Sequence, residues 1–258
     1  MWTWLFLGLM IWGSGEPTVA AHTETVVFEG RPLMIQWNPE TRTPLTMRSG
    51  DGVPLLEIKG IARRTRDQIT LSGPLLVKKY QKFFGLQTDQ LRLKGAEQVD
   101  GSWYVSYWQT VKGIIIYETS LGFSIDPQGR IQSLGAVLYP TVSFPEGFRI
   151  TREQALNVAR AHIPDFKKQD YALVAENVLL TPEKGPEGIR FYKVYALNFF
   201  PRRALHPASG VGGYAVFIDT QSERIIRRET LFKPLGCCVP ENWTPPKPEE
   251  LYKGMFGN

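Results

Sequence analysis

One pattern occurs twice along the chain and constrains the fold more than any other feature: apolar residues at helical spacing, followed by apolar residues that alternate. The first copy begins at residues 74–84, where the apolar positions fall on one helical stripe: Leu76, Val77, Tyr80, Phe83 and Phe84. Pro74 suits the first position of a helix, and Gly85 suits its C-terminal end. We therefore predict one helix over 74–84.

After this helix the apolar period changes from 3.6 to 2. In residues 102–110, Trp103, Val105 and Tyr107 share one face, which is typical of a strand. Residues 113–119 are apolar on both faces, which predicts a central strand. Two further strands, 121–125 and 130–139, joined by a tight turn at 126–129, complete an antiparallel meander.

The second copy of the pattern starts at a capping box made by Thr151 and Gln154, which predicts a helix over 152–162. Four strand-like segments follow it: 171–180, 189–200, 214–219 and 224–231. Two successive helix-plus-strand units indicate an α+β fold, in which each helix packs on an antiparallel β-sheet.

The chain begins with an apolar run, Trp2 to Trp12, that is shorter than the roughly 20 helical residues needed to cross a bilayer. Val19 and Ala21 are the small residues of a signal-peptidase site, so we predict a secretory signal over 1–21 that is cleaved after Ala21. A short uncleaved membrane anchor is the alternative. Cleavage would leave no transmembrane span and a secreted or periplasmic protein in a compartment where thiols oxidise.

Composition narrows the class of protein. The 258 residues are 43% hydrophobic and 21% charged, which excludes a disordered tail, a collagen-like repeat and a polytopic membrane protein. The formal net charge is +5, with small basic clusters at Arg63, Arg64 and Arg66 and at Arg224, Arg227 and Arg228. Such clusters more often form a solvated face than a ligand site. Export also argues against nucleic acid as a partner.

Sequence motifs for catalysis are missing. The three histidines, His22, His162 and His206, do not form a His-Glu-x-x-His zinc motif. The chain also has no Gly-x-Ser-x-Gly nucleophile motif, and the glycines at 210–213 precede a strand instead of cradling a phosphate. We predict that the protein is not an enzyme and has no catalytic residues, no metal ligands and no cofactor. A triad scattered through the fold stays open as an alternative.

The two cysteines of the chain, Cys237 and Cys238, are adjacent. They could form a disulfide with each other, pair between chains, or stay as thiols. A disulfide between neighbours needs a strained ring, because adjacent Cα atoms lie about 3.8 Å apart. Five prolines between 232 and 258 predict an extended tail without regular structure around this pair.

Several short motifs resemble a known family. Phe-Phe-Gly-Leu at 83–86, Gln-Thr and Gly-Ile at 109–114, and Ile-Asp-x-x-Gly-Arg-Ile at 125–131 together resemble the fungalysin/thermolysin propeptide (FTP) motif. Residues 37–44 resemble the Asn/Asp-Pro-x-Thr-Gly-Thr-Pro loop often found ahead of it, with Arg42 in place of the usual Gly. The segment 150–225 is similar to a PepSY domain.

This resemblance implies two cystatin-like units and divides the chain as follows: signal peptide 1–21, N-terminal strand and turn region 22–71, FTP-like domain 72–148, PepSY-like domain 149–231 and Pro-rich tail 232–258. In the family, both domains belong to the pro-region of secreted thermolysin-type zinc metallopeptidases. They assist folding of the peptidase and block its active site. Here only 27 residues would follow the second domain, so inherited catalysis is not expected.

Two functions follow as expectations. The first is an exported, non-catalytic, propeptide-like binding module of the cell envelope or secreted fraction, with an envelope protein as its partner. The alternative is a protease inhibitor or folding helper that acts in trans on a secreted zinc metallopeptidase. The inhibitor or folding helper would use a sheet edge or the extended tail, laid into the protease cleft by strand addition.

Overall fold

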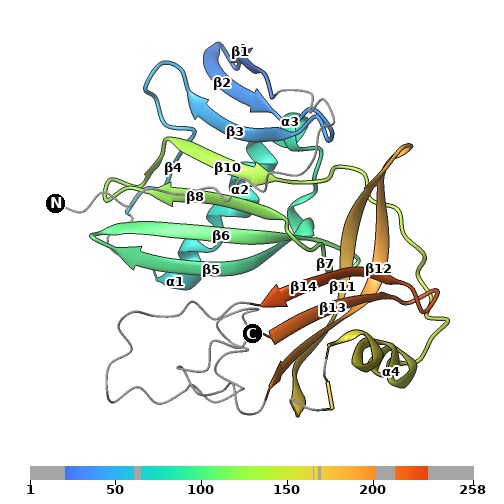
Figure 1. Ribbon diagram of the computed structural model, residues 1–258. Helices are drawn as coiled ribbons and strands as arrows, with labels where there is room; N and C mark the ends of the chain where they lie inside the picture. Colours follow the sequence, from blue (N-terminus) through green and yellow to red (C-terminus); the bar gives the residue numbers. More distant parts are fainter. Residues whose placement is uncertain (1–20, 61–64, 165, 168–169, 202–212, 232–258) are drawn as a thin grey trace.

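The computed structural model of the chain describes residues 21–60, 65–164, 166–167, 170–201 and 213–231. Two large antiparallel sheets, a separate pair of short strands and a few helices are found in these residues, so the predicted α+β class is confirmed (Figure 1). In the part of the chain described, no helix is long and apolar enough to cross a membrane.

The larger sheet has the strand order β1-β2-β3-β10-β8-β6-β5, with the short strand β7 beside β6. The bounds are β1 Thr23–Phe28, β2 Arg31–Trp37, β3 Pro44–Ser49, β5 Leu91–Val99, β6 Ser102–Val111, β7 Ile114–Ile115, β8 Ser120–Ile125 and β10 Ser133–Val137. A separate pair, β4 (Leu56–Glu57) and β9 (Arg130–Ile131), lies beside it. Residues 22–71 thus contribute three strands to the same sheet as the meander that follows them.

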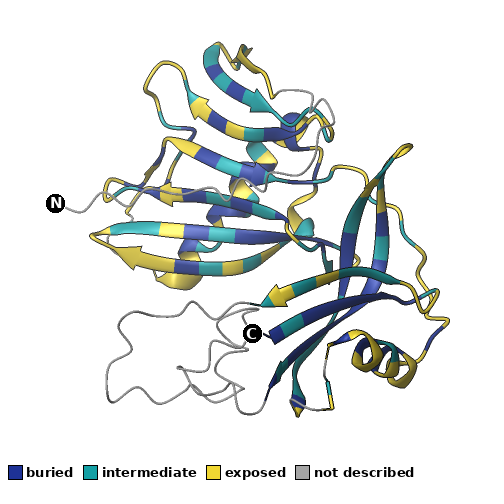
Figure 2. Cartoon of the chain, in the orientation of Figure 1, coloured by how far each residue is buried: buried dark blue, intermediate teal, exposed yellow. Residues whose placement is uncertain are grey.

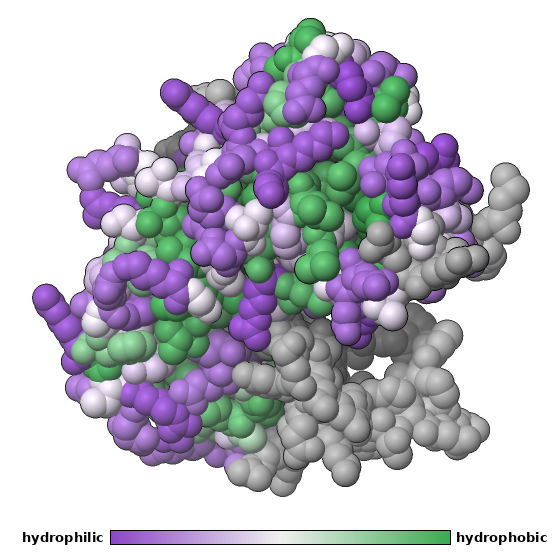
Figure 3. Space-filling view, turned by 180° about the vertical axis from the view of Figure 1, so that it is seen from behind, coloured by the Kyte–Doolittle hydropathy of each residue, from purple (hydrophilic) through white to green (hydrophobic). Residues whose placement is uncertain are grey.

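One face of this sheet is covered by short helices: α1 (Arg66–Ile69), α2 (Ser72–Lys79), α3 (Gln81–Phe84) and the 3-10 helix η2 (Thr88–Gln90). Leu76, Val77 and Phe84 of these helices are fully buried in a cluster that includes Ile35 and Leu121 of the strands. Figure 3 shows the molecule from this side, where apolar side chains also reach the surface.

The smaller sheet has the order β11-β12-β13-β14, with bounds Tyr171–Gly185, Gly188–Pro201, Gly213–Asp219 and Ile225–Leu231. Helix α4 (Arg152–His162) packs on it, and its buried residues Ala155, Leu156 and Ala159 lie in one cluster with Leu197 and Phe199 of β12. The predicted capping box is confirmed, because Thr151 Oγ1 accepts from Gln154 N–H and the Gln154 side chain accepts from Thr151 N–H.

Two predicted elements are wrong, and a third, the single strand over 130–139, is divided between β9 and β10. The single helix over 74–84 is broken at Tyr80, whose φ of −109° and ψ of 26° separate α2 from α3, although Gly85 ends the helical segment in the left-handed conformation as expected. The central strand over 113–119 does not form, because the backbone turns at Lys112 and Gly113 and again at Glu118, all with positive φ. In this segment the two residues of β7 pair with β6, and Ile116 makes a single bridge to another strand.

The apolar residues of that segment instead connect the two sheets. Ile116 is fully buried and bridges Leu180 of β11, and the Tyr117 N–H donates to Leu180 O at 2.7 Å. The Tyr117 ring lies 4.8 Å from the ring of Phe217 in β13. An apolar run that faces protein on both sides is therefore explained by contact with a second sheet rather than by a central position in the first.

Candidate functional site

Strand β1 forms an exposed edge of the larger sheet (Figures 1 and 2). Its sequence, Thr-Glu-Thr-Val-Val-Phe, pairs with β2 in one unbroken register, and Val27 is 69% exposed. The strand has no Pro, no Lys and no bulge, which are devices that proteins use to prevent an edge from pairing with another chain. Backbone groups on such an edge are a template for an additional strand.

The hydrogen-bond pattern shows which backbone groups of β1 face outward. Trp37 N–H donates to His22 O at 3.0 Å, so His22 and Trp37 form a hydrogen-bonded pair. Because such pairs alternate along an antiparallel ladder, Glu24, Val26 and Phe28 also bond toward β2. The N–H and C=O groups of Thr23, Thr25 and Val27 therefore point away from the sheet.

Other edges in the described residues carry the features that β1 lacks. Strand β5 has a register shift between Leu93 and Gly95 and carries Lys94 at that point. Strand β14 has a register shift opposite Phe217 and Ile218 and contains consecutive charged residues, Arg227 to Glu229. Strand β11 is shifted between Leu173 and Ala175 and is bridged by Ile116 at Leu180. We call β1 the unguarded edge, because it is an outer strand, in the part of the chain described, without a register shift, a Pro or a Lys.

A hollow of about 450 Å³ lies at the start of β1 and is lined by His22, Glu24, Trp37, Asn38, Pro39 and Arg42. Glu24 Oε1 accepts from the Trp37 indole N–H at 2.9 Å, while Glu24 Oε2 lies 3.9 Å from His22 Nε2. The hollow therefore brings together an aromatic ring, a carboxylate, an imidazole and a guanidinium at the start of the edge strand.

The loop 38–43 that forms the floor of this hollow is built by its own polar groups. Asn38 Oδ1 accepts from the N–H groups of Glu40 and Thr41 at 2.9 and 3.3 Å. Buried Thr43 donates its hydroxyl to Leu138 O at 3.2 Å, which attaches the loop to the segment after β10. Arg42 adopts a φ of 56°, in the left-handed region. Glycine adopts this backbone conformation more readily than a residue with a Cβ does.

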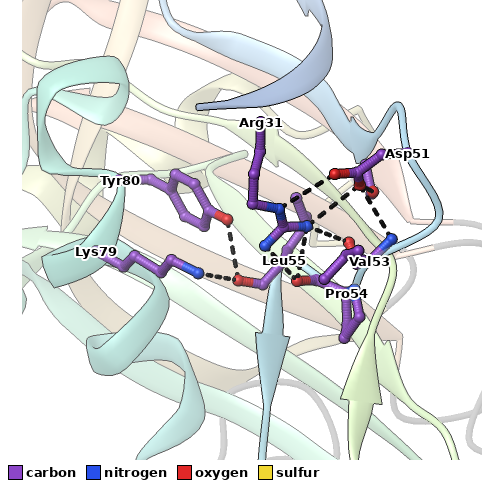
Figure 4. A network of polar contacts seen from close by, with 8 residues as sticks. Arg31, Asp51, Val53, Pro54, Leu55, Lys79 and Tyr80 are labelled. Atoms are coloured by element: carbon purple, nitrogen blue, oxygen red, sulfur yellow. Dashed lines mark hydrogen bonds and ion pairs between the residues drawn. The ribbon is translucent and has the colours of Figure 1, made fainter. Parts of the chain in front are cut away.

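The other end of β1 is fixed by the network shown in Figure 4. The turn at Glu29 and Gly30 has positive φ at both residues, as a two-residue hairpin turn requires. After it, the Arg31 guanidinium donates to both carboxylate oxygens of Asp51 at 3.3 Å and to Val53 O at 2.5 Å. The Asp51 carboxylate also accepts from Ser49 Oγ at 2.6 Å. The hairpin that carries β1 is thereby connected to the loop 49–54.

These contacts perturb two titrating groups. The hydrogen bonds from Arg31, followed by those from Ser49 and the Val53 N–H, hold the pKa of Asp51 well below its usual range. Burial raises the pKa of Tyr80 to about 12. The Tyr80 hydroxyl donates to Leu55 O at 2.9 Å, and Lys79 Nζ donates to the same oxygen at 2.7 Å. The helical segment and the hairpin thus meet at the 51–55 loop.

A second hollow of about 400 Å³ lies between the two sheets, where Tyr139, Pro140, Ile189 and Phe191 form its apolar part. An ion pair between Glu40 Oε1 and Lys184 Nζ at 2.7 Å lies in its lining and joins the loop 38–43 to the β11–β12 hairpin. This hollow is lined by residues that already pack on one another, with the Tyr139 and Phe191 rings 5.1 Å apart. We therefore consider this hollow a weaker candidate binding site than the hollow at the start of β1.

The residues named from sequence have different outcomes. Cys237, Cys238, His206 and nearly all of the predicted signal lie outside the described residues, which begin at Ala21, so the predicted cleavage after Ala21 and the state of the cysteines stay predictions. His162 ends α4, and its Nδ1 lies 2.8 Å from Val158 O. Within the described ranges, no group of three or more His, Cys, Asp or Glu residues could hold a metal ion.

The sequence predicts strands and turns over 22–71, which include Val26 to Phe28, but it does not identify an edge strand there. The signal is present in the run of β-branched residues with one charge at 23–28. Its position at an edge depends on which later strands join the sheet, and that information is not local.

Comparisons with known proteins place the chain in no family. No family model matches it, and no curated protein matches it. The C-terminal domain of YpeB from Bacillus megaterium is a structural neighbour with 13% identity and a TM-score of 0.38, covering 82% of this chain and 89% of that one. A candidate lipoprotein from Clostridium difficile 630 has 10% identity and a TM-score of 0.20, covering 60% and 88%. Similarity at this level assigns no function.

Proposed function

We propose that this protein is an exported, non-catalytic binding module that holds an extended peptide segment of an envelope or secreted protein by strand addition to β1. The observation that carries this proposal is the unguarded edge, with the backbone groups of Thr23, Thr25 and Val27 directed outward. Export rests on the sequence of residues 1–21, and the cell envelope, periplasm or medium is the proposed location.

Strand addition separates affinity from specificity. Main-chain hydrogen bonds to the edge supply affinity for any extended segment, and pockets for alternate side chains select among sequences. The hollow around Trp37 and Glu24 lies where such a pocket is needed, at one end of β1. Its aromatic ring favours a flat side chain, whereas a cation is not favoured, because Arg42 lines the same hollow and Glu24 already accepts from Trp37.

A proline variant tests whether the edge binds partners. Thr25→Pro removes an outward N–H and leaves the bonds of Glu24 and Val26 toward β2 in place. We expect the wild-type protein, immobilised and exposed to the secreted or periplasmic fraction of its own cell, to retain a partner that Thr25→Pro loses. Thr25→Ala keeps the N–H and should retain the partner. Equal capture by all three proteins, with equal thermal unfolding midpoints, would exclude β1 as the binding edge.

The same edge supports the second candidate function, inhibition or assisted folding of a secreted zinc metallopeptidase in trans. Peptidases bind their substrates as extended chains, so an unpaired strand fits the cleft of such an enzyme. The resemblance of residues 83–131 to the FTP motif favours this class of partner. If the purified protein at micromolar concentration neither inhibits nor refolds a thermolysin-type peptidase, this candidate is wrong, while capture of another envelope protein would still support the first.

A further inference from the structure

We propose that β1 also binds β1 of a second copy of this chain, so that the free protein is an antiparallel dimer related by a two-fold axis at Thr25. This inference does not depend on the proposed function, because self-association is measured without a peptide. Both use the same backbone groups, and the dimer would therefore have to separate before a partner could bind.

The spacing of the outward groups selects one register. Thr23, Thr25 and Val27 are the outward residues of each copy, since Glu24, Val26 and Phe28 bond toward β2. If Thr25 lies opposite Thr25, then Thr23 lies opposite Val27, and all the outward N–H and C=O groups find partners. A shift by two residues in either direction leaves one outward residue of each copy unpaired.

The side chains agree with this register. It places Glu24 of one copy opposite Val26 of the other, whereas the shift that pairs Thr23 with Thr25 would place the two Glu24 side chains opposite each other. Like charges that are directly opposite destabilise a strand pair, and β-branched pairs stabilise it. Exposed Val27 would pack beside Thr23 of the second copy.

Charge complementarity adds to this argument. Lys82 Nζ lies 4.4 Å from the centre of the Phe28 ring. In the proposed register, Phe28 is a diagonal neighbour of Glu24 of the second copy, because it follows Val26 by two residues. Diagonal neighbours lie about 7–8 Å apart, within reach of long side chains. Phe28 lies directly opposite His22 of the second copy in this register. The Glu24 carboxylate, which already accepts from the Trp37 indole N–H of its own copy, would have the Lys82 ammonium of the opposite copy within diagonal reach, twice in a symmetric pair.

A charge-swap experiment tests the register. Thr25→Lys places two lysines at the two-fold axis, and Thr25→Glu places two glutamates there. By sedimentation equilibrium up to about 100 µM, we expect the wild-type protein to form dimers and each variant alone to associate about fivefold to tenfold more weakly. An equimolar mixture of the two variants should recover the association, because lysine then lies opposite glutamate.

Controls keep the result interpretable. Thr46 is exposed in β3 on the same sheet face, so Thr46→Lys should dimerise like the wild type. Thermal unfolding midpoints establish that the Thr25 variants are folded. A wild-type protein that stays monomeric, or variants whose association is unchanged alone and in mixture, would overturn the proposal. Those outcomes would not contradict the proposed binding of a partner segment to β1, because the Thr25→Pro capture experiment tests that binding separately.

Discussion

At the scale of single residues, Arg42 holds a backbone conformation that is unfavourable for a residue with a side chain. Its φ of 56° is a conformation that a residue with a Cβ adopts at a cost of roughly 1–2 kcal/mol. Arg42→Gly removes this cost, although it also makes the unfolded chain more flexible, by about 0.4–1 kcal/mol. We expect a net gain of about 0.5–1 kcal/mol in the free energy of unfolding by urea denaturation.

Arg42→Ala is the matched control, because it removes the charge and keeps the Cβ. It should not gain stability. If Arg42→Ala is as stable as Arg42→Gly, the gain comes from the lost charge, and the left-handed backbone is not the cause.

Asp51 predicts how stability depends on pH. Its pKa is lowered in the folded protein, chiefly by the hydrogen bonds from Arg31. A carboxylate with a lowered folded pKa stabilises the protein above its unfolded pKa of about 4 and loses that effect as the pH falls through the folded value. The wild type should therefore be more stable than Asp51→Asn at pH 7, and the difference should shrink as the pH falls below about 4.

Urea midpoints measured at pH values from about 7 down to 2 will show this trend. Ser49→Ala removes only one of the hydrogen bonds to Asp51. It should therefore lower stability at pH 7 by less than Asp51→Asn does. A difference between the wild type and Asp51→Asn that stays constant over this range would mean that the carboxylate charge does not stabilise the hairpin.

At the scale of elements, helix α2 lies unusually close to strand β6 at Gly73. Gly73 N–H donates to the Tyr107 hydroxyl at 3.2 Å, and that hydroxyl donates to Thr70 O at 2.5 Å. A Cβ on Gly73 would lie 2.4 Å from carbons of the Tyr107 ring. Overpacking costs about 1–3 kcal/mol, and alanine in place of glycine gains about 1 kcal/mol in a helix. Gly73→Ala should therefore lower the unfolding free energy by up to about 2 kcal/mol.

Gly95 in β5 gives the comparison for this prediction. A Cβ there would meet Ser106 Oγ at 3.8 Å, which is ordinary contact distance. Gly95→Ala should change the unfolding free energy little. If Gly73→Ala is also neutral, the helix can move away from β6, and the close approach is not required for packing.

The elements also show what could be predicted from the sequence. Helix α4 was predicted with its capping box, because every signal for it lies within a dozen residues. The break at Tyr80 was missed, because the apolar stripe continues across it and only the backbone angles reveal it. The strand over 113–119 was predicted wrongly, because contact with a second sheet and a central position in one sheet give the same apolar pattern.

The candidate site was the least predictable part for a related reason. The sequence drew attention to loop 37–44 because it resembles the loop found ahead of the FTP motif. In the structure this loop and the start of β1 line the same hollow. The edge itself depends on β10 pairing with β3, which lie about 90 residues apart in the chain. No local pattern contains that pairing.

At the scale of the whole molecule, the contacts of Tyr117 hold the two sheets together. Its hydroxyl donates to Glu229 Oε2 at 2.8 Å, and Arg227 bonds both Glu118 and Glu229. Burial, followed by the bond to Glu229, raises the pKa of Tyr117. Tyr117→Phe keeps the ring contact with Phe217 and removes the hydroxyl. We expect a loss of about 1–2 kcal/mol in the unfolding free energy.

The matched control is Tyr104→Phe. Tyr104 is 49% exposed on β6, and removal of its hydroxyl should change stability by less than about 0.5 kcal/mol. A Tyr117→Phe protein as stable as the wild type would mean that the polar cluster between the sheets contributes no net stability.

The central claim is that β1 offers an unpaired row of backbone groups to another chain. Amide hydrogen exchange resolved by residue tests it most directly. In dilute protein, the amides of Thr23, Thr25 and Val27 should exchange fast, while those of Glu24, Val26 and Phe28 exchange slowly because they bond to β2. Raising the protein concentration, or adding a captured partner, should slow the first set. Outward amides that are already as protected as the inward ones in dilute protein would contradict the account.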